Sequence, residues 1–390
     1  MTGPSPAPLA EKADIVRGVT FSKADAVGEP RDGYSPVLRA GNIQGQLILD
    51  HGLVFVPESK ISEKQRLRCG DIVMCTSSGS TEIVGKTAYS EKDWDGSFGA
   101  FCAVVRPKEG QCHPRYLFHY LQSPKFRDWT RNSSGAGIKN IRKSELDAVE
   151  ISFPNIDEQR RIARILDKAE AIRRKREQAL DLADEFLRAS FLEIFGDPRE
   201  IQNSDQVLDD IADVARGRFS PRPRNDPRYY GGDFPFIQTG EIANSDGYLF
   251  EFKQTLNEKG IGVSKCFPSG TVLVAIVGAT IGATAVSSRE FYCPDSVIGI
   301  TSRDEEYPPE FIEYLLRFWR PVFVARAPET ARANINLQTL KPVPIPQSAN
   351  GEAKKFGALY KKIHSIKSRL RNSEQSLLEA LSQRAFSGEL

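Results

Sequence analysis

The chain contains 390 residues with a formal net charge of +2; 27% of its residues are charged and 40% are hydrophobic. This length allows two to four domains, the composition is that of a globular protein, and the small net charge excludes a uniformly basic surface, so any nucleic-acid site must be local. Six scattered cysteines without a C-x-x-C pair and only four histidines argue against a zinc site, and the lack of a signal core or a membrane-length apolar run predicts a cytoplasmic protein.

Residues 1–155 are predicted to form a sheet-rich domain. The first 13 residues are rich in Pro, Ala and Gly and are expected to form a loose leader. From Ile15 to about Pro154, short apolar runs alternate with Gly, Asp and Ser, which is the pattern of strands joined by turns. One helix is predicted from Pro114 to about Trp129, because apolar residues recur on one face and proline suits a first helical turn.

A single long helix is predicted next, within the segment 156–198. No Gly or Pro occurs from Ile156 to Phe195, and Gly196-Asp197-Pro198 supplies strong stop signals. Its apolar residues recur at helical spacing, and a long helix with one apolar face requires a partner. The partner is expected in the last segment, 347–390, where a loop from Gln347 to Gly351 precedes a second amphipathic stretch. A simple dimerisation coil is the plainer alternative for these helices.

The segment 199–346 repeats the plan of the first domain. Short motifs recur at offsets of 194 to 200 residues, among them Arg17-Gly18 with Arg216-Gly217, Leu38–Ile43 with Ile237–Ile242, Gly70–Val73 with Gly270–Leu273, and Asn140-Ile141 with Asn334-Ile335. A single short match of this kind can arise by chance, but several matches in register indicate a tandem duplication. The predicted fold is therefore α+β, with two tandem sheet-rich domains separated by two long antiparallel coiled-coil helices in a pseudo-two-fold repeat.

The motifs that would support enzyme chemistry fail on spacing or context. The stretch from Gly79 to Thr87 looks like a phosphate-binding P-loop, but five residues separate its glycines where the motif has four, and the chain then continues as a strand. The stretch Asn225–Tyr230 echoes the Asp-Pro-Pro-Tyr type motif of amino-methyltransferases, but Arg228 replaces a proline. Four histidines offer no Ser/His/Asp or Cys/His set. No catalytic residue is predicted.

The remaining polar signals are loops that carry Arg, Lys, Asn, Gln, Ser or Thr beside glycine or proline. The richest of them runs from Arg216 to Asn225 and contains four arginines. Such side chains contact DNA phosphates and the edges of guanine or adenine, although a cationic loop is more often only solvated. The candidate DNA-binding residues are Arg17, Arg39, Asn42, Ser78, Ser80, Lys86, Lys139, Asn140, Arg142, Arg218, Arg222, Arg224, Gln238, Thr239, Thr280, Arg332, Asn334 and Asn336.

Taken together, these features resemble the specificity (S) subunit of type I restriction–modification systems over essentially the whole chain. The resemblance rests on the Arg-Gly opening of each repeat, on Gly70-Asp71-Ile72-Val73 with its glycine loop, on Pro154-x-x-x-x-Gln159-Arg-x-Ile162 before the first long helix, and on the terminal Ala385-Phe386-Ser-Gly388. One departure is that the second long helix lacks the Pro-x-x-x-x-Gln motif at its start.

The resemblance implies a non-catalytic subunit with two target-recognition domains, each of which reads half of a bipartite, asymmetric double-stranded DNA site. It also implies that the paired helices set the spacing and dock two methyltransferase subunits, which ATP-dependent restriction subunits join. S-adenosylmethionine, ATP and Mg are then expected in those partners, and no cofactor is expected in this chain. The alternative is a non-catalytic adaptor whose repeats bind proteins on a coiled-coil scaffold.

Overall fold

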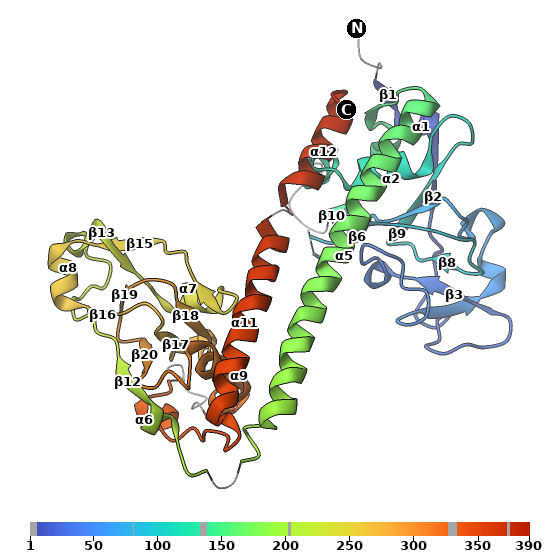
Figure 1. Cartoon of the computed structure of the whole chain (residues 1–390). Coiled ribbons are helices and arrows are strands. Elements are labelled where there is room, and N and C mark those ends of the chain that lie inside the picture. Colours follow the sequence, from blue (N-terminus) through green and yellow to red (C-terminus); the bar gives the residue numbers. More distant parts are fainter. Residues whose placement is uncertain (1–5, 81, 133–138, 202–203, 327–333, 373–374) are drawn as a thin grey trace. The chain divides into compact units, whose positions relative to one another are not determined.

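The computed structural model describes all residues except 1–5, 81, 133–138, 202–203, 327–333 and 373–374. The chain divides into two compact units, one formed by residues 1–177 with 371–390 and the other by residues 178–370. Each unit contains a sheet-rich body and helical segments, and one long helix contributes to both units (Figure 1).

The first unit is built on a four-stranded antiparallel sheet with strand order β2-β9-β5-β7. All four residues of β5 are buried, which is why its apolar run shows no alternation. A three-stranded sheet has the order β4-β3-β8, and two short pairs join β1 with β11 and β6 with β10. The strands are β1 (Pro6–Pro8), β2 (Ala13–Arg17), β3 (Tyr34–Leu38), β4 (Val54–Pro57), β5 (Ile72–Cys75), β6 (Ser77–Ser78), β7 (Thr87–Tyr89), β8 (Ser97–Phe98), β9 (Cys102–Pro107), β10 (Lys139–Asn140) and β11 (Glu150–Ser152).

The N-terminal segment takes a defined place in this unit. The strand β1 pairs with β11, and α1 (Leu9–Lys12) follows it directly. Leu9 is fully buried, and its N–H donates to the carbonyl of Val149 at 2.8 Å. The expectation of a loose leader is therefore wrong for residues 6–13, because a buried leucine and strand pairing hold them; residues 1–5 lie outside the described residues.

The helix predicted from Pro114 to about Trp129 is two helices, α2 (Pro114–Gln122) and α3 (Pro124–Asn132). Ser123 has extended backbone angles, with φ −64° and ψ 153°. Pro124 explains the break, because proline removes an N–H and disfavours helical geometry at the residue before it. The short α4 (Lys143–Asp147) completes the helices of this body.

The second unit repeats the same plan, and each of its two main sheets has one strand more than its counterpart in the first unit. Its sheets have the orders β12-β20-β17-β18-β14 and β15-β13-β19-β16. The strands are β12 (Ala212–Arg216), β13 (Tyr230–Phe236), β14 (Tyr248–Leu249), β15 (Gln254–Leu256), β16 (Lys265–Phe267), β17 (Val272–Ala275), β18 (Thr284–Ser287), β19 (Phe291–Cys293) and β20 (Val297–Ser302). The helices are α6 (Leu208–Ile211), α7 (Thr239–Ala243), α8 (Glu258–Val263), α9 (Pro309–Arg326) and α10 (Leu337–Leu340).

Backbone hydrogen bonds of the first unit have counterparts at the corresponding positions of the second unit, which confirms the internal repeat. The bond from Leu9 to Val149 corresponds to the bond from Leu208 N–H to the Val343 carbonyl, which is also 2.8 Å.

One buried site differs between the two units. In the first unit, Asp71 is 1% exposed and accepts two 2.7 Å hydrogen bonds from Arg106, whereas a Thr271–Thr301 hydroxyl contact of 3.1 Å stands at the same place in the second.

The long helix α5 runs from Ile156 to Phe195, with the predicted ends. Within the second unit, the ring of Phe191 packs on Phe356 of α11 (Ala349–Asn372) at 5.2 Å, and Asp184 pairs with Lys367 at 2.5 Å. Rising numbers on α5 meet falling numbers on α11, so these helices are antiparallel. Within the first unit, Ile162 and Leu166 pack with Ala385 of α12 (Gln375–Ser387).

The C-terminal helical segment differs from its prediction in two ways. It begins at Ala349, inside the stretch expected to be a loop, because the N–H of Ala349 already bonds the Pro346 carbonyl at 2.9 Å. It also consists of two helices, α11 and α12, rather than one; residues 373–374 lie outside the described residues.

Gln159 explains the Pro-x-x-x-x-Gln motif at the start of α5. It is 1% exposed, its Oε1 accepts the backbone N–H of His113 at 2.8 Å, and its Nε2 donates to the Pro154 carbonyl at 2.8 Å. One side chain thus ties the start of α5 to the start of α2. The corresponding residue of the second unit is the buried Ala353, where no such bridge is possible.

Candidate nucleic-acid interface

In the first unit, the end of β2 lies directly against the turn that leads into β9. A Cβ added at Gly18 would stand 2.1 Å from the carbonyl oxygen of Gly99, so only glycine allows this approach. The contact places Arg17, the exposed last residue of β2, beside the turn Gly99–Phe101. Residues that are far apart in the sequence therefore share one surface.

Phe101 is the most exposed large hydrophobic residue of that turn, with 68% of its surface accessible. Its carbonyl accepts hydrogen bonds from Thr76 N–H at 2.9 Å, Ser77 N–H at 3.1 Å and the Thr76 hydroxyl at 3.2 Å. The backbone is thus fixed while the ring faces solvent. A fixed, exposed aromatic ring suits stacking on a base or contact with a thymine methyl group. Sequence reasoning missed Phe101, because residue type alone does not separate an exposed ring from a core ring.

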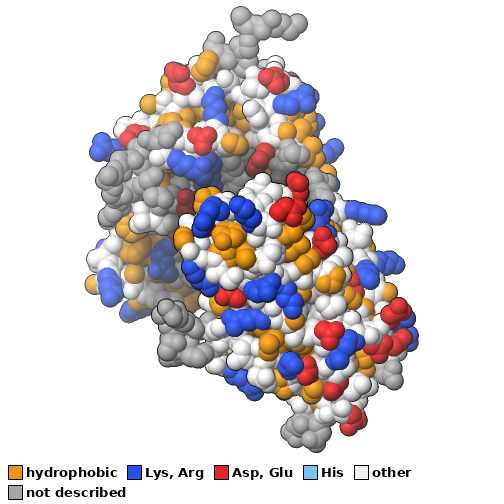
Figure 2. All heavy atoms as spheres, turned by 90° about the vertical axis from the view of Figure 1, so that its left-hand side faces the viewer, with side chains coloured by type: hydrophobic (Ala, Val, Ile, Leu, Met, Phe, Trp, Pro, Cys, Tyr) orange, Lys and Arg blue, Asp and Glu red, His pale blue; other side chains and the backbone are white. Residues whose placement is uncertain are grey.

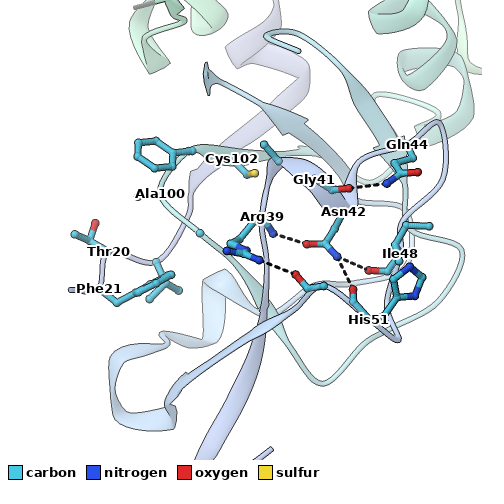
Figure 3. Close-up of a pocket in the computed structure, with 15 residues that line it drawn as sticks. Thr20, Phe21, Arg39, Gly41, Asn42, Gln44, Ile48, His51, Ala100 and Cys102 are labelled. Atoms are coloured by element: carbon cyan, nitrogen blue, oxygen red, sulfur yellow. Dashed lines mark hydrogen bonds between the residues drawn. The ribbon is translucent and has the colours of Figure 1, made fainter. Parts of the chain in front are cut away.

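A cavity of about 850 Å³ adjoins this ring, and its lining is mostly apolar. Figure 3 shows Arg39 in the middle of this pocket, with Thr20 and Phe21 on one side and Ile48 and His51 on the other. The guanidinium of Arg39 donates to the Gly52 carbonyl at 3.2 Å, which holds the charge at the pocket. The predicted site residue Arg39 therefore shares a pocket with Phe101.

Asn42, another predicted site residue, braces the pocket rather than facing out of it. It is 3% exposed, its Nδ2 donates to the carbonyls of Ile48 at 3.1 Å and His51 at 2.9 Å, and its Oδ1 accepts the Arg39 N–H at 2.9 Å (Figure 3). Contact with DNA through this amide would require the loop to give up those bonds. In the second unit, Glu241 accepts the Gln238 N–H at 3.3 Å in the same way.

A second, smaller cavity of about 150 Å³ is also lined by Phe101, together with Arg17 and Asn140. Asn140 stands opposite Ser77 in the β6–β10 pair, and Lys139 stands opposite Ser78. The Ser78 hydroxyl accepts the N–H of Ser80 at 3.1 Å. Among the predicted residues, Arg17, Arg39 and Asn140 thus border Phe101. Ser78 ends β6, and Ser80 lies in the loop that follows it.

Two further predicted cations lie next to these elements. Lys86 is exposed immediately before β7, and its carbonyl accepts the N–H of Cys75 at 2.9 Å. Arg142 is exposed immediately before α4, and its N–H donates to Glu145 at 2.7 Å.

In each unit, the glycine after a strand and the turn that it meets form a junction, Gly18 with Gly99 in the first unit and Gly217 with Pro294 in the second. The two junctions carry different side chains. A Cβ at Gly217 would stand 2.2 Å from the carbonyl oxygen of Pro294, so the end of β12 lies against the turn Pro294–Ser296. Asp295 in this turn contacts three arginine side chains. Its carbonyl accepts Arg216 Nε at 2.6 Å, and its carboxylate pairs with Arg224 at 2.5 Å and Arg222 at 3.6 Å. Sequence reasoning found the arginines and missed the aspartate that gathers them.

A cavity of about 520 Å³ at this junction is lined by Arg224, Gln238 and Ser296, among others. Gln238 is exposed and donates to Gln254 Oε1 at 2.5 Å. Arg218 is also exposed and donates to the Ser264 carbonyl at 3.2 Å. The predicted residues Arg222, Arg224 and Gln238 therefore meet at one place.

The other predicted residues of the second unit have local roles. The Thr280 hydroxyl donates to the Val277 carbonyl at 2.9 Å, and Val277 forms a bridge with the exposed Asn334, as Ser77 pairs with Asn140 in the first unit. Asn336 caps α10 by accepting the Thr339 N–H at 3.2 Å. Thr239 is the first residue of α7. Arg332 lies outside the described residues.

The described surface carries cationic and hydrophobic side chains next to one another (Figure 2). Figure 2 shows Lys and Arg side chains gathered around hydrophobic side chains near the middle of the face it displays. Burial raises the pKa of the Cys102 thiol, beside Phe101, to about 12, which keeps it protonated and unreactive at neutral pH. In the described part of the chain, no cluster of three or more His, Cys, Asp or Glu is placed to hold a metal ion. No described helix has the length and hydropathy needed to cross a membrane.

The chain belongs to the family described as the type I restriction modification DNA specificity domain, whose sequence profile matches residues 9–182 and 204–373. The type I restriction enzyme StySPI specificity subunit of Salmonella potsdam is 39% identical over 162 residues, and the EcoKI specificity subunit of Escherichia coli strain K12 is 38% identical over 162 residues. Each alignment covers 41% of this chain and 35% of the relative, so the chain spans about a third of the length of these curated relatives.

Solved structures share the fold at low sequence identity. The crystal structure of a type I restriction-modification system S subunit from M. genitalium matches with a TM-score of 0.63 and 14% identity over 99% of both chains. A structure that concerns complex assembly and conformational transition of the type I R-M system matches with a TM-score of 0.55 and 16% identity, over 100% of this chain and 99% of the other. The predicted architecture, with two sheet-rich target-recognition repeats and long helices, is thereby confirmed.

Proposed function

We propose that this chain is the non-catalytic DNA-reading subunit of a type I restriction–modification complex, and that each repeat reads one half of a bipartite, asymmetric site. The observation that carries the proposal is the repeated junction, where Gly18 meets Gly99 and Gly217 meets Pro294. Each junction holds a cavity and exposed polar or aromatic side chains on a buried scaffold. Side chains that differ between two such junctions would read two different half-sites.

The helices are proposed to set the distance between half-sites and to dock two methyltransferase subunits. The apolar residues Leu182 and Phe186 of α5 are 63% and 51% exposed, and they lie four residues apart on one helix face. Exposed apolar side chains at that spacing favour a protein partner. ATP-dependent restriction subunits would join this core, and the whole assembly would act in the cytoplasm, where the DNA is. S-adenosylmethionine, ATP and Mg would be bound by the partners and not by this chain.

The direct test is co-expression with the cognate methyltransferase, followed by sequencing of the host methylome and DNA-binding measurements on the purified complex. The proposal predicts methylation of one bipartite motif and an affinity that falls steeply with salt, because phosphate contacts release counterions. A protein-binding adaptor would give a partner interaction that salt changes little. A complex that contains the methyltransferase yet methylates and protects no defined sequence would overturn the proposal.

The spacing role has its own test. Seven residues inserted between Glu177 and Gln178 of α5, with seven inserted between α11 and α12, lengthen the helical segment by about 10 Å at 1.5 Å per residue. That length corresponds to roughly three base pairs at about 3.4 Å per step. The tolerated spacer in the methylated motif should change by that amount with both half-sites unchanged, and an unchanged spacer would contradict a ruler function.

A further inference from the structure

Arg222 and Arg224 are exposed, but Asp295 holds them in place. Their side chains are 58% and 49% exposed, and the Asp295 side chain is 33% exposed. The Asp295 carboxylate lies 2.5 Å from an Arg224 nitrogen and 3.6 Å from an Arg222 nitrogen, and the Arg222 fork also donates to the carbonyls of Phe219 at 3.0 Å and Pro221 at 2.8 Å. Two long side chains are thus restricted before any ligand arrives.

This restriction lowers the entropy lost on binding and fixes the direction of the remaining donors. A guanidinium carries five N–H donors in a planar fork, so a contact with one carboxylate leaves other donors available. A bidentate contact requires such an orientation, whereas attraction to a diffuse negative charge does not. The geometry therefore favours a planar acceptor with two oxygen or nitrogen atoms side by side.

The Asp295 carboxylate also separates the two candidate acceptors in DNA. A phosphate bound by Arg224 would lie near a like charge, which lowers the benefit of the contact. The major-groove edge of guanine presents the neutral acceptors O6 and N7, which suffer no such repulsion and match the arginine fork. A base edge is therefore favoured over the backbone at this position.

We propose that Arg222 and Arg224 read a guanine-containing position in the half-site of the second repeat, and that Asp295 is the positioning residue that presents them. The inference rests on the proposed DNA-reading function and adds which base pair is read and by which residues. The first repeat has Ala100 where the second has Asp295, together with the exposed Phe101, so its half-site is read by different contacts at the same junction.

The test compares the methylomes of hosts that express the methyltransferase together with one form of this chain. The forms are the wild type, Arg224→Ala, Arg224→Gln, Asp295→Asn and the control Arg228→Ala. Arg228 is 74% exposed and pairs with Asp226 in the same loop, so its removal matches the loss of one exposed arginine. Arg224→Ala should relax one G·C position of one half-site, with roughly 10- to 100-fold lost discrimination and the other half-site unchanged. Arg224→Gln should shift that position toward A·T, because glutamine matches the adenine edge.

Asp295→Asn should relax the same position to a smaller extent, and Arg228→Ala should leave the motif as in the wild type. A merely structural role for Asp295 would lower methylation at all sites without changing the motif, and that result would overturn the inference. An unchanged motif in Arg224→Ala would also overturn it. The same holds if Arg224→Ala lowers the slope of log affinity against log salt concentration by about 0.9, because that change marks a lost phosphate contact. A wild-type complex without any defined motif would instead refute the proposed function itself.

Discussion

The turns that lead into β9 and β20 occupy the same place in the two units but carry different chemistry. The first presents Phe101, whose ring is 68% exposed above a hydrogen-bonded backbone. The second presents Asp295, which pairs with Arg222 and Arg224. Both turns lie against a glycine at the end of the preceding strand, Gly18 or Gly217, with no room for a Cβ. The junction is therefore retained while the side chains on it differ.

This difference separates the parts of the fold that support recognition from the parts that would perform it. Replacing a buried glycine at a close approach costs stability, whereas an exposed side chain on a fixed turn can be exchanged at little cost in stability. Under the proposed function, duplication followed by change at the exposed positions would give one chain two different reading surfaces. The same separation predicts that scaffold variants lose stability and surface variants lose selectivity.

The largest expected effect concerns Asp71 and Arg106, whose place is taken by Thr271 and Thr301 in the second unit. Asp71→Ala leaves Arg106, which is 17% exposed, without its carboxylate, and should lower the free energy of unfolding by about 3–5 kcal/mol. The double variant Asp71→Thr/Arg106→Thr copies the second unit and should recover most of that loss. Urea unfolding measures both; a double variant no more stable than Asp71→Ala would show that the two sites are not equivalent.

The two junction glycines should behave alike. Gly18→Ala and Gly217→Ala each place a Cβ within 2.1 or 2.2 Å of a carbonyl oxygen and should cost up to about 3 kcal/mol of unfolding free energy. Gly28→Ala and Gly262→Ala are matched controls, since a Cβ at either position meets no atom within 4 Å. Thermal unfolding of the four variants compares them. Equal stability of the junction and control variants would refute the close-approach argument.

The attachment of α5 should be specific to the first unit. Gln159→Ala leaves the part-buried His113 N–H and Pro154 carbonyl without their partner and should cost about 2 kcal/mol. Gln159→Glu keeps an acceptor for the His113 N–H but sets a buried carboxylate against the Pro154 carbonyl, so its loss of stability should be at least as large. Hydrogen exchange of the His113 amide provides the local readout. An amide as protected in Gln159→Ala as in the wild type would contradict the bridging role.

A smaller, pH-dependent effect is expected at Glu170 of α5, whose side chain is 14% exposed. His364 of α11, which packs against Tyr248, takes the corresponding place in the second repeat. Hydrogen bonds from Arg173 foremost, and from Arg174, lower the pKa of Glu170 to about 2. Since the folded state binds this proton more weakly than the unfolded chain, the contribution is complete above about pH 4.5 and is lost as the pH falls toward 2. Glu170→Gln should therefore cost roughly 1 kcal/mol at pH 6 and progressively less toward pH 3. Urea unfolding at both pH values measures this difference, with Glu185→Gln on the same helix as control, and a deficit independent of pH would contradict it.

The architecture was largely predictable from the sequence because its signals are local or repeated. The absence of Gly and Pro from Ile156 to Phe195, closed by Gly196, predicts α5 correctly, and motifs at a nearly constant offset predict the duplication. The N-terminal segment was not predictable, because its order depends on Leu9 reaching Val149 across the chain. The broken helix at Pro124 carried a local signal in its proline.

The candidate interface was only partly predictable. Residue type and loop composition identified Arg39, Arg222 and Arg224, which the structure places at the two junctions. Residue type could not show that the Asn42 amide is hydrogen-bonded to loop carbonyls, since the same group would suit a base contact. Phe101 and Asp295 were missed, because their importance arises from contacts between segments about 80 residues apart.

The most direct measurement is the methylome of hosts that carry the methyltransferase with the wild-type chain, with Phe101→Ala, or with Arg224→Ala. Phe250→Ala, which removes a phenylalanine that is 56% exposed and outside both junctions, serves as control. If each repeat reads one half-site, Phe101→Ala changes one half of the bipartite motif, Arg224→Ala changes only the other half, and the spacer stays constant. Changes by both variants in the same half, or a motif unchanged by either, would contradict the assignment of one half-site to each repeat.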